Sequence, residues 1–380
     1  MRRILGIMLA VTVALGATAC GKSAGGSAKG AAAGTPTGTE KSAPAAAGAE
    51  KSASADEGTG QSALADTGTE PELVIQLGHI DPATNDPYQM LAELFAGKVK
   101  ELSGGTIQID ILSDAQLGSE ASMIEGMKLG TIDCAIISNF SYSSNIPEFC
   151  TFDMPYLFTS EKQAHAVMDS QDITGDLIQK LYDEYDVKIL AYAEGGFRSV
   201  INTKCAVNTP EDLKSMKIRV PGNETYLATF SALGSNPVSM ASSECYTGLQ
   251  QGTIDGLEQP IGPMYSYKSY EVCKYISLTE HLYNPISLTV SRSLWESLSE
   301  EQKGWILEAA EYARDTERAQ VPELNEKLLK AMVEEKGIEV NEIEDKEAFR
   351  KAVQPVYDEY TAKYGSERLD KINALIDSLK

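Results

Sequence analysis

Two arginines stand out among the residues that could do chemistry in this 380-residue chain, which carries a formal net charge of −22. Arg219 lies near the end of the segment "KIRVPG", and Arg198 lies in "GGFRSV". A guanidinium can hold a carboxylate through two parallel hydrogen bonds, which supply both charge and orientation. The two residues therefore predict a local site for a carboxylate ligand, working against the negative field of the whole chain.

Each arginine also has a plain structural interpretation. In an alternating strand, Ile218 and Val220 face the core while Lys217 and Arg219 face solvent. The pattern of "KIRV" alone does not separate the two interpretations of Arg219. For Arg198 the ligand interpretation is stronger, because neighbouring glycines let a ligand approach the backbone.

Polar residues that follow predicted strands are further candidates. In open α/β sheets, ligands bind beyond the carboxyl ends of the strands. The residues weighed at such positions are His79, Ser138, Asn139, Glu258 and Gln259, together with Asn236, which stands before "PVSM".

Other motifs for catalysis or metal binding are weak. The three histidines, His79, His165 and His281, are far apart and form no H-E-x-x-H, so we expect neither a metal centre nor a cofactor. "GATACGKS" and "GKSAG" match the phosphate-loop and nucleophile-elbow patterns, but they lack the strand-to-helix context that either function needs.

The elements that must position these residues alternate between strand and helix. The first half contains predicted strands at 73–80, 106–112 and 131–137 around helices at 87–105 and 119–130. The second half contains predicted strands at 187–194, 197–204, 217–222, 236–241 and 253–260 around helices at 209–216, 223–234 and 242–252. This alternation predicts an α/β fold with a mainly parallel sheet and helices on both faces.

An eight-residue segment occurs in similar form in both halves. Residues 126–133 are "GMKLGTID" and residues 248–255 are "GLQQGTID", and each leads from a helix into an apolar strand. The match predicts two related lobes, although a common helix-Gly-strand connection used twice would also produce it. A long helical stretch begins after Ser299, which is predicted as its N-cap with Glu301 or Gln302 placed for a capping box. Pro322 is expected to kink this helix, which could bridge both lobes.

The N-terminal sequence and the composition indicate where the protein acts. Arg2 and Arg3 precede a short apolar run that ends before Cys20, which is typical of a secretory signal at 1–19 in lipoprotein form. Residues 20–72 are rich in Ala, Gly, Ser and Thr and predict a flexible tether.

The excess of 55 acidic over 33 basic residues argues against nucleic acid as a partner. The five remaining cysteines are expected to be buried free thiols rather than a disulfide framework.

Several segments resemble the extracytoplasmic solute-binding proteins of tripartite ATP-independent periplasmic (TRAP) transporters. They are "LGSEASMIEGMKLGTIDCAI", "EFCTFDMPYLF" and the block from "EGGFRSVINTK" through "KIRVPGNETYLATFSALG" to "GLQQGTIDGLEQP". The resemblance implies two Rossmann-like lobes with a ligand cleft between them and a long helix spanning both. It places 73–195 with about 284–320 in lobe I, and 196–283 with about 321–380 in lobe II.

The same resemblance implies roles for individual residues. The family's signature arginine, which pairs with the ligand carboxylate, falls on Arg219, and a second arginine falls on Arg198. The asparagine of the family's E-N-P motif corresponds to Gln259 in "LEQP", a departure that moves the amide about one methylene further out. Contacts with ligand hydroxyls are expected from four residues, His79, Asn85, Glu120 and Asn139.

The resemblance also implies a function without catalysis. A sugar acid such as a hexuronate is the favoured ligand, with C4-dicarboxylates as the alternative within the family. The protein is expected to capture this ligand by hinge closure and to deliver it to two membrane subunits. It is also expected to be a monomer with a lipid anchor on Cys20. The rival hypotheses are a secreted enzyme that uses Glu244 and Glu258 on acidic sugars, and a binding protein that serves an ATP-driven importer or a sensor kinase.

Overall fold

The computed structural model describes residues 71–84 and 86–380. The expected signal peptide, Cys20, Asn85 and all but the last two residues of the expected tether lie outside these ranges. Within the described part, no helix is both long enough and apolar enough to cross a membrane.

The structure alternates between strands and helices along the chain. The strands are β1 (Leu73–Gly78), β2 (Ile107–Leu112), β3 (Cys134–Ser138), β4 (Val187–Asn202), β5 (Lys217–Val220), β6 (Asn236–Ser239), β7 (Gly256–Gln259), β8 (Tyr275–Ser291) and β9 (Glu339–Glu342). The α-helices are α1 (Pro87–Leu102), α2 (Glu120–Lys128), α3 (Asn139–Tyr142), α4 (Glu161–Met168), α5 (Gln171–Tyr185), α6 (Glu224–Ala232), α7 (Cys245–Gln251), α8 (Ile261–Ser266), α9 (Arg292–Ser297), α10 (Glu300–Lys336), α11 (Glu347–Ala352), α12 (Gln354–Tyr364) and α13 (Glu367–Ser378). Short 3₁₀ helices are η1 (Pro147–Asp153), η2 (Pro210–Leu213), η3 (Ser242–Glu244) and η4 (Ser269–Glu271).

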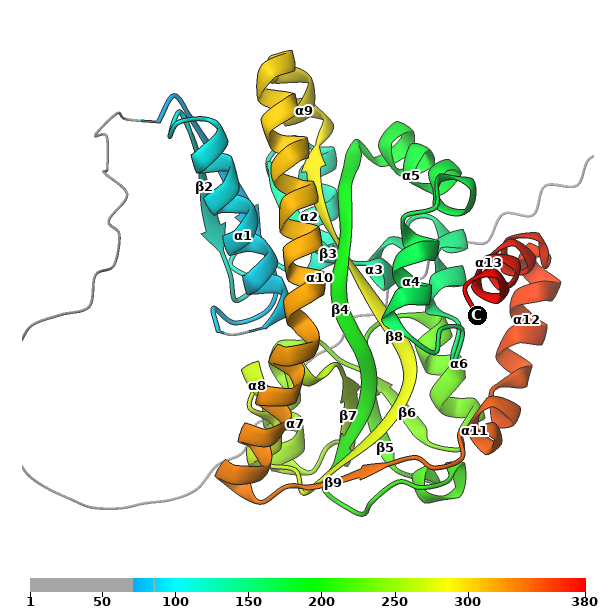
Figure 1. The fold of residues 1–380 in the computed structure, drawn as a ribbon. Helices are drawn as coiled ribbons and strands as arrows, with labels where there is room; N and C mark the ends of the chain where they lie inside the picture. Colours follow the sequence, from blue (N-terminus) through cyan, green and yellow to red (C-terminus); the bar gives the residue numbers. More distant parts are fainter. Residues whose placement is uncertain (1–70, 85) are drawn as a thin grey trace, which may run out of the picture. The chain divides into compact units, whose positions relative to one another are not determined.

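One sheet runs through both lobes, in the order β2-β1-β3-β8-β4-β7-β5-β6, with β9 beside β8 (Figure 1). The two edges of the sheet have matching strand orders when each is counted from the outside inward: β2-β1-β3 at one edge corresponds to β6-β5-β7 at the other. Each outer set is parallel, as the alternation predicts. The expectation of a mainly parallel sheet fails at the centre, where β4 and β8 are antiparallel to each other. β4 is also antiparallel to its other neighbour β7, and β8 to its other neighbour β3.

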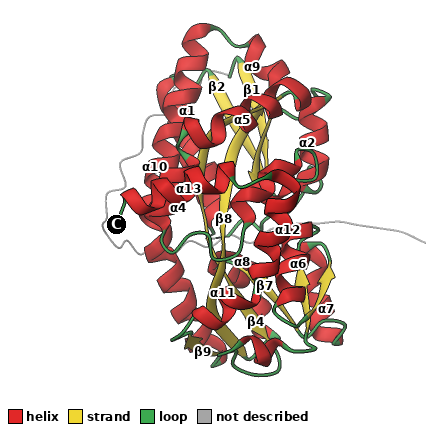
Figure 2. Cartoon of the chain, turned by 90° about the vertical axis from the view of Figure 1, so that its right-hand side faces the viewer, coloured by secondary structure: helices red, strands yellow, loops and turns green. Residues whose placement is uncertain are grey.

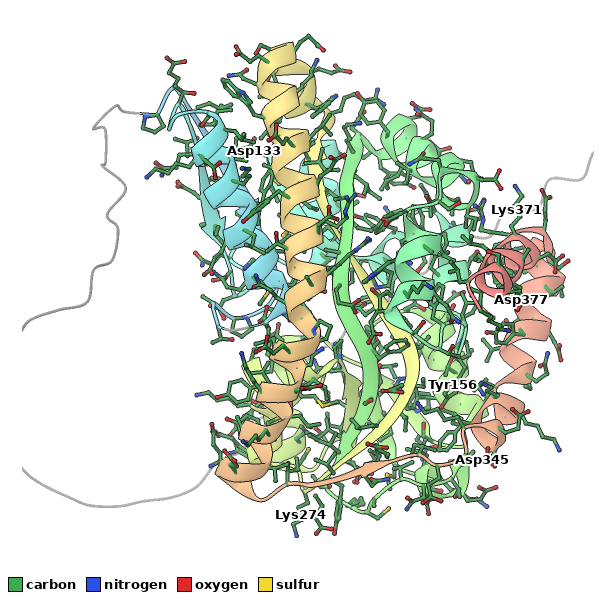
Figure 3. The ribbon with its side chains drawn as sticks, in the orientation of Figure 1. Asp133, Tyr156, Lys274, Asp345, Lys371 and Asp377 are labelled. Atoms are coloured by element: carbon green, nitrogen blue, oxygen red, sulfur yellow. The ribbon has the colours of Figure 1, made fainter. Side chains whose placement is uncertain are left out.

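β4 is a single strand of 16 residues, although the sequence predicts two shorter strands there. The glycines between the two predicted strands make an irregularity in the pairing with β8 rather than a break. A Cβ at Gly195 would lie 2.3 Å from the carbonyl oxygen of Asn284, so glycine is what allows β8 to approach. β8 has 17 residues and is equally continuous. Figure 3 shows Lys274, just before β8, at the lower end of the molecule and Asp133, just before β3, near the upper end.

The repeated segments form the same local structure twice. Thr131 donates its backbone N–H (2.9 Å) and its hydroxyl (3.1 Å) to the carbonyl oxygen of Gly126. Thr253 does the same to Gly248, at 3.0 and 3.1 Å. These bonds turn the chain from the end of α2 into β3 and from the end of α7 into β7.

The repeated aspartates also have matching partners. Asp133 accepts a hydrogen bond from the backbone N–H of Gln76 in β1, at 3.2 Å. Asp255 accepts one from the backbone N–H of Lys217 in β5, at 2.9 Å. Each aspartate thus fixes its own strand against the first strand of its lobe, which supports two related lobes over a common connection used twice.

Helix α10 spans the length of the sheet (Figure 1) and packs on α1 near one end and on α8 near the other. Its N-terminus has the predicted capping box, with Ser299 and Gln302 bonded reciprocally. The helix has 37 residues and contains Pro322. One apolar cluster fills the space between α1, α10 and the first lobe's strands, and a second lies around α7 and α8.

The C-terminal helices cross back toward the first lobe. α12 packs against α6, whereas α13 packs against α4 and α5 (Figure 2). Arg368 of α13 forms a bidentate ion pair with Asp176 of α5, at 2.6 and 2.9 Å. The resemblance assigns this C-terminal segment to lobe II, and that assignment stays a prediction. A third apolar cluster, with Phe149, Phe230 and Phe349, joins the two lobes on this side.

Candidate ligand-binding site

Two adjoining pockets lie where strands of both lobes end. The inner pocket has a volume of about 30 Å³, and its polar lining is Asp81, Tyr88, Ser138, Arg198, Arg219, Ser242, Gln259 and Asn284. The outer pocket has a volume of about 670 Å³, and its polar lining includes Asp114, Ser119, Glu120, Ser141, Ser242, Glu244 and Tyr267. Arg219 lines both pockets.

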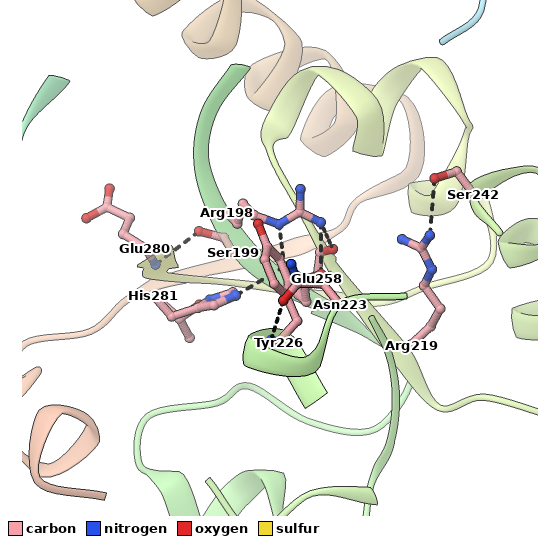
Figure 4. A network of polar contacts seen from close by, with 10 residues as sticks. Arg198, Ser199, Arg219, Asn223, Tyr226, Ser242, Glu258, Glu280 and His281 are labelled. Atoms are coloured by element: carbon pink, nitrogen blue, oxygen red, sulfur yellow. Dashed lines mark hydrogen bonds and ion pairs between the residues drawn. The ribbon is translucent and has the colours of Figure 1, made fainter. Parts of the chain in front are cut away.

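Arg219 is only 3% exposed, so the solvent-facing interpretation from strand alternation is wrong. The alternation rule fails because β5 is buried on both faces beyond Lys217. Its Nε donates to the carbonyl oxygen of Met240 at 2.7 Å, and its Nη2 donates to Ser242 Oγ at 3.2 Å (Figure 4). Both acceptors are neutral, and no ion pair to Arg219 exists within the described residues. Burial lowers the pKa of Arg219, because its hydrogen-bond acceptors are neutral and do not offset the loss of solvation.

Arg198 lies on β4 and is 4% exposed, but its charge is compensated. Nε lies 2.5 Å from Glu258 Oε2, and Nη2 lies 2.8 Å from Oε1 and 2.9 Å from the Glu258 carbonyl oxygen. His281 Nε2 lies 3.2 Å from the same Oε2 (Figure 4). Burial alone would lower the pKa of Arg198, but the Glu258 carboxylate outweighs burial and raises it.

The guanidinium of Arg198 also lies against aromatic rings. Its Cζ is 5.1 Å from the ring centroid of Tyr226 and 5.8 Å from that of Phe140. Within the part of the chain described, neither Arg198 nor Arg219 uses its Nη1 in a hydrogen bond. Each arginine therefore retains a donor for a ligand in the inner pocket.

Three further residues from the sequence prediction lie at the pockets. Ser138 and Gln259 line the inner pocket; the Ser138 hydroxyl bonds the hydroxyl of Tyr88, and Gln259 Oε1 is buried without a partner in the described chain. Glu120 lines the outer pocket, accepts the backbone N–H of Ser138 at 2.8 Å and bonds the hydroxyl of Ser141. Burial raises the pKa of Glu120, which begins α2 as the sequence suggested.

Three other candidates line neither pocket. His79 is buried, with Nε2 3.0 Å from Gln89 Oε1. Asn139 follows β3 as the first residue of α3, and its amide nitrogen donates to Phe149 O and to Asp153 Oδ1, at 3.2 and 3.3 Å.

Asn236 is the third of these, and it is exposed at the start of β6. Since β6 is parallel to β5, this position lies at the end of the strand pair opposite to Val220. Asn85 lies outside the described residues, so its predicted contact stays a prediction.

Sequence reasoning missed Asp81, Tyr88, Ser242 and Asn284. Asp81 comes directly after the predicted strand 73–80, so the same rule that selected His79 could have found it. Asn284 lies within the long strand β8 and carries no sequence signal. Asp81 is 2% exposed, and burial raises its pKa well above the usual range.

The geometry does not favour the enzyme hypothesis. Glu258 is held by Arg198 and His281, and although burial opposes ionisation, Arg198 lowers the pKa of Glu258. Glu244 is exposed and accepts the backbone N–H of Ala241 at 3.2 Å. Within residues 71–84 and 86–380, no group of three or more acidic, His or Cys side chains could hold a metal ion.

Comparison with known proteins defines the class. The family model described as bacterial extracellular solute-binding protein, family 7, matches residues 77–363, and the chain belongs to this family. It is 33% identical over 273 residues to the 2,3-diketo-L-gulonate-binding periplasmic protein YiaO of Escherichia coli, covering 72% of this chain and 82% of that protein. The resemblance to TRAP solute-binding proteins is thereby confirmed.

Solved structures of TRAP periplasmic solute-binding proteins agree with the two-lobed fold. One, from a Sulfitobacter species with bound β-D-galacturonate, has a TM-score of 0.74 and 31% identity over 80% of this chain and 99% of that chain. Another, from Chromohalobacter salexigens with bound D-glucuronate, has the same TM-score, identity and coverage. The chain is therefore a solute-binding protein of a transport system, and members of its family act outside the cytoplasm.

Proposed function

We propose that this protein captures a sugar-acid anion of hexuronate size in the inner and outer pockets and delivers it to the membrane subunits of a TRAP transporter. The observation that carries the proposal is Arg219, a buried cation that lines both pockets and bonds only neutral oxygens. A ligand carboxylate supplies the missing counter-charge. In a site that excludes water, this ion pair is stronger than at the surface.

The two arginines could suggest a dianionic ligand, and a C4-dicarboxylate is the second candidate. The ion pair between Arg198 and Glu258 weighs against it, because only one cation in the inner pocket lacks an acidic partner among the described residues. Relatives of this chain with hexuronates bound support the same choice.

Hinge closure is the proposed mode of capture. The inner pocket has room for little more than one or two waters, so a sugar acid needs the lobes to part further. Asn223, just after β5, donates its amide to Phe140 O (3.1 Å), Ser143 Oγ (2.8 Å) and Asp153 Oδ2 (3.2 Å) across to the first lobe. These bonds would hold the closed form. The irregular β4–β8 pairing between Glu194 and Phe197 provides a place to bend.

A thermal-shift screen tests the ligand class. Purified protein is heated with D-galacturonate, D-glucuronate, aldonates and C4-dicarboxylates, and we expect the hexuronates to raise the melting temperature most. Arg219→Gln should abolish the shift, and Arg314→Gln on the surface of α10 should retain it. A full shift in Arg219→Gln would refute the carboxylate site.

The finer expectations about location belong to the same proposal. A lipid on Cys20 would anchor a monomer outside the cytoplasmic membrane, with residues 20–72 as the tether. Cys20→Ser should then move the protein from the membrane fraction to the soluble fraction, and size exclusion of the released protein should give a single chain's mass. Retention of Cys20→Ser in the membrane fraction would refute the anchor.

A further inference from the structure

The inner pocket combines one uncompensated cation with several unused acceptor oxygens. Asp81 Oδ2, Gln259 Oε1 and Asn284 Oδ1 are buried and have no hydrogen-bond partner within the described residues. All three residues line the pocket that also contains Arg198 and Arg219. The hydroxyl of Tyr267, which lies close by, donates instead to the carbonyl oxygen of Ile80, at 2.9 Å.

Unused acceptors favour a ligand that brings donors. A buried acceptor left without a donor costs free energy that a matching ligand hydroxyl recovers. The hydroxyls of a sugar acid are such donors, whereas a carboxylate brings none. The acceptors therefore discriminate between ligands that share one carboxylate but differ in the rest of the molecule.

Asp81 is the carboxyl group of the inner pocket's lining, and none of the ion pairs among the described residues includes it. Because burial raises the pKa of Asp81 and so favours its protonated form, this residue does not itself repel a second ligand carboxylate. A second carboxylate would instead lack a counter-charge, because Arg198 is already paired with Glu258 and Arg219 holds the first carboxylate. A hydroxyl beside Asp81 can donate to it in either protonation state of the carboxyl group.

We propose that Asp81 selects polyhydroxy monocarboxylates over dicarboxylates, by accepting hydrogen bonds from ligand hydroxyls that a second carboxylate cannot supply. The inference rests on the proposed function, because it takes the ligand's first carboxylate to bind at Arg219. It also sets the ligand's direction: Arg219 lies on β5 in the second lobe, and Asp81 follows β1 in the first. The carboxylate then faces the second lobe and the hydroxyls face the first.

Calorimetric titration of the whole protein with D-glucuronate and with succinate tests the assignment. In wild type we expect glucuronate to bind at least 100-fold more tightly than succinate. Asp81→Asn should reduce that ratio at least tenfold by weakening glucuronate, because an amide nitrogen replaces one of the two acceptor oxygens. Asp358→Asn is the matched control, since Asp358 is an exposed aspartate of α12 that lines neither pocket, and it should leave the ratio unchanged.

A second variant, Asp81→Ser, removes the carboxyl group but keeps a hydroxyl and should weaken glucuronate in the same way. Neutralising an unpaired buried acid removes a desolvation penalty, so both variants should melt no lower than wild type without ligand. A wild-type ratio of affinities in folded Asp81→Asn and Asp81→Ser would overturn the role of Asp81 alone. A wild-type protein that binds succinate but no hexuronate would overturn the proposed function as well.

Discussion

Arg198 and Glu258 form a buried ion pair in which Nε lies 2.5 Å from Oε2 and Nη2 lies 2.8 Å from Oε1. Arg198 therefore enters the inner pocket already neutralised, and Arg219 is left as the cation that needs an external anion. The same protein thus holds two buried arginines with opposite consequences for stability.

Removing the partner of Arg198 should be costly. Glu258→Gln leaves a buried guanidinium without its counter-charge, and we expect a loss of about 3–5 kcal/mol in the free energy of unfolding. Urea denaturation measures it. The control is Asp176→Asn, which breaks the more exposed pair with Arg368 and should cost less than about 1 kcal/mol. Equal losses in the two variants would show that Glu258 does not neutralise Arg198.

Removing the charge of Arg219 should have the opposite effect on stability. Burial lowers the pKa of Arg219, so the ligand-free protein holds this charge at a cost. Arg219→Gln should unfold at the same urea concentration as wild type or at a higher one, while hexuronate binding is lost. A marked loss of ligand-free stability would indicate a structural role for Arg219 instead.

The stability of the ligand-free protein should rise as the pH falls from 8 to 5. Burial raises the pKa of Asp153 from 3.8 to about 7, although hydrogen bonds from Asn139 and Asn223 oppose the shift. Burial likewise raises the pKa of Asp86 to about 7. A raised pKa means that the folded state binds the proton more tightly. The resulting stabilisation is full below pH 3.8 and is lost as the pH rises through 7.

Melting temperatures between pH 5 and pH 8 measure this dependence. Asp153→Asn should reduce its slope, whatever the change in absolute stability. Asp212→Asn is a control whose effect on the pH dependence should have the opposite sign. Burial favours a higher pKa for Asp212, but hydrogen bonds from Asn208 and Thr209 outweigh burial and lower the pKa. The stability that Asp212 contributes is therefore lost as the pH falls. An unchanged slope in Asp153→Asn would contradict the assignment.

The repeated glycines should differ in their tolerance of a side chain. A Cβ at Gly126 would lie 2.6 Å from Ile132 Cδ1, whereas at Gly248 the nearest side-chain atom would be 3.3 Å away. Gly126→Ala should therefore lower the free energy of unfolding by about 1–3 kcal/mol, and Gly248→Ala by less. Gly97→Ala in α1, where a Cβ meets nothing within 4 Å, should stabilise by about 0.5–1 kcal/mol. Destabilisation by Gly97→Ala equal to that by Gly126→Ala would refute the steric argument.

Local patterns in the sequence predict much of this fold but only part of the site. The strand–helix alternation, the repeat and the cap at Ser299 depend on residues close in the chain, and the structure confirms them. The pairing of Arg198 with Glu258 depends on the antiparallel register of β4 and β7, which aligns Val200 with Glu258 and has no local signal. Burial of Arg219 depends on layers packed over both faces of β5. Asn284 is at the pocket only because β8 is long and continuous.

The matching strand orders at the two edges of the sheet have a consequence for recognition. Equivalent strand ends of the two lobes meet at the inner pocket: Ser138 ends β3, and Gln259 ends β7. The backbone frames are alike, but one half supplies the free guanidinium and the other supplies Asp81. The matching strand order therefore does not make the two sides of the pocket alike, because the side chains at the strand ends differ. These side chains give the pocket a cationic side and an acceptor side, and so a direction for a bound anion.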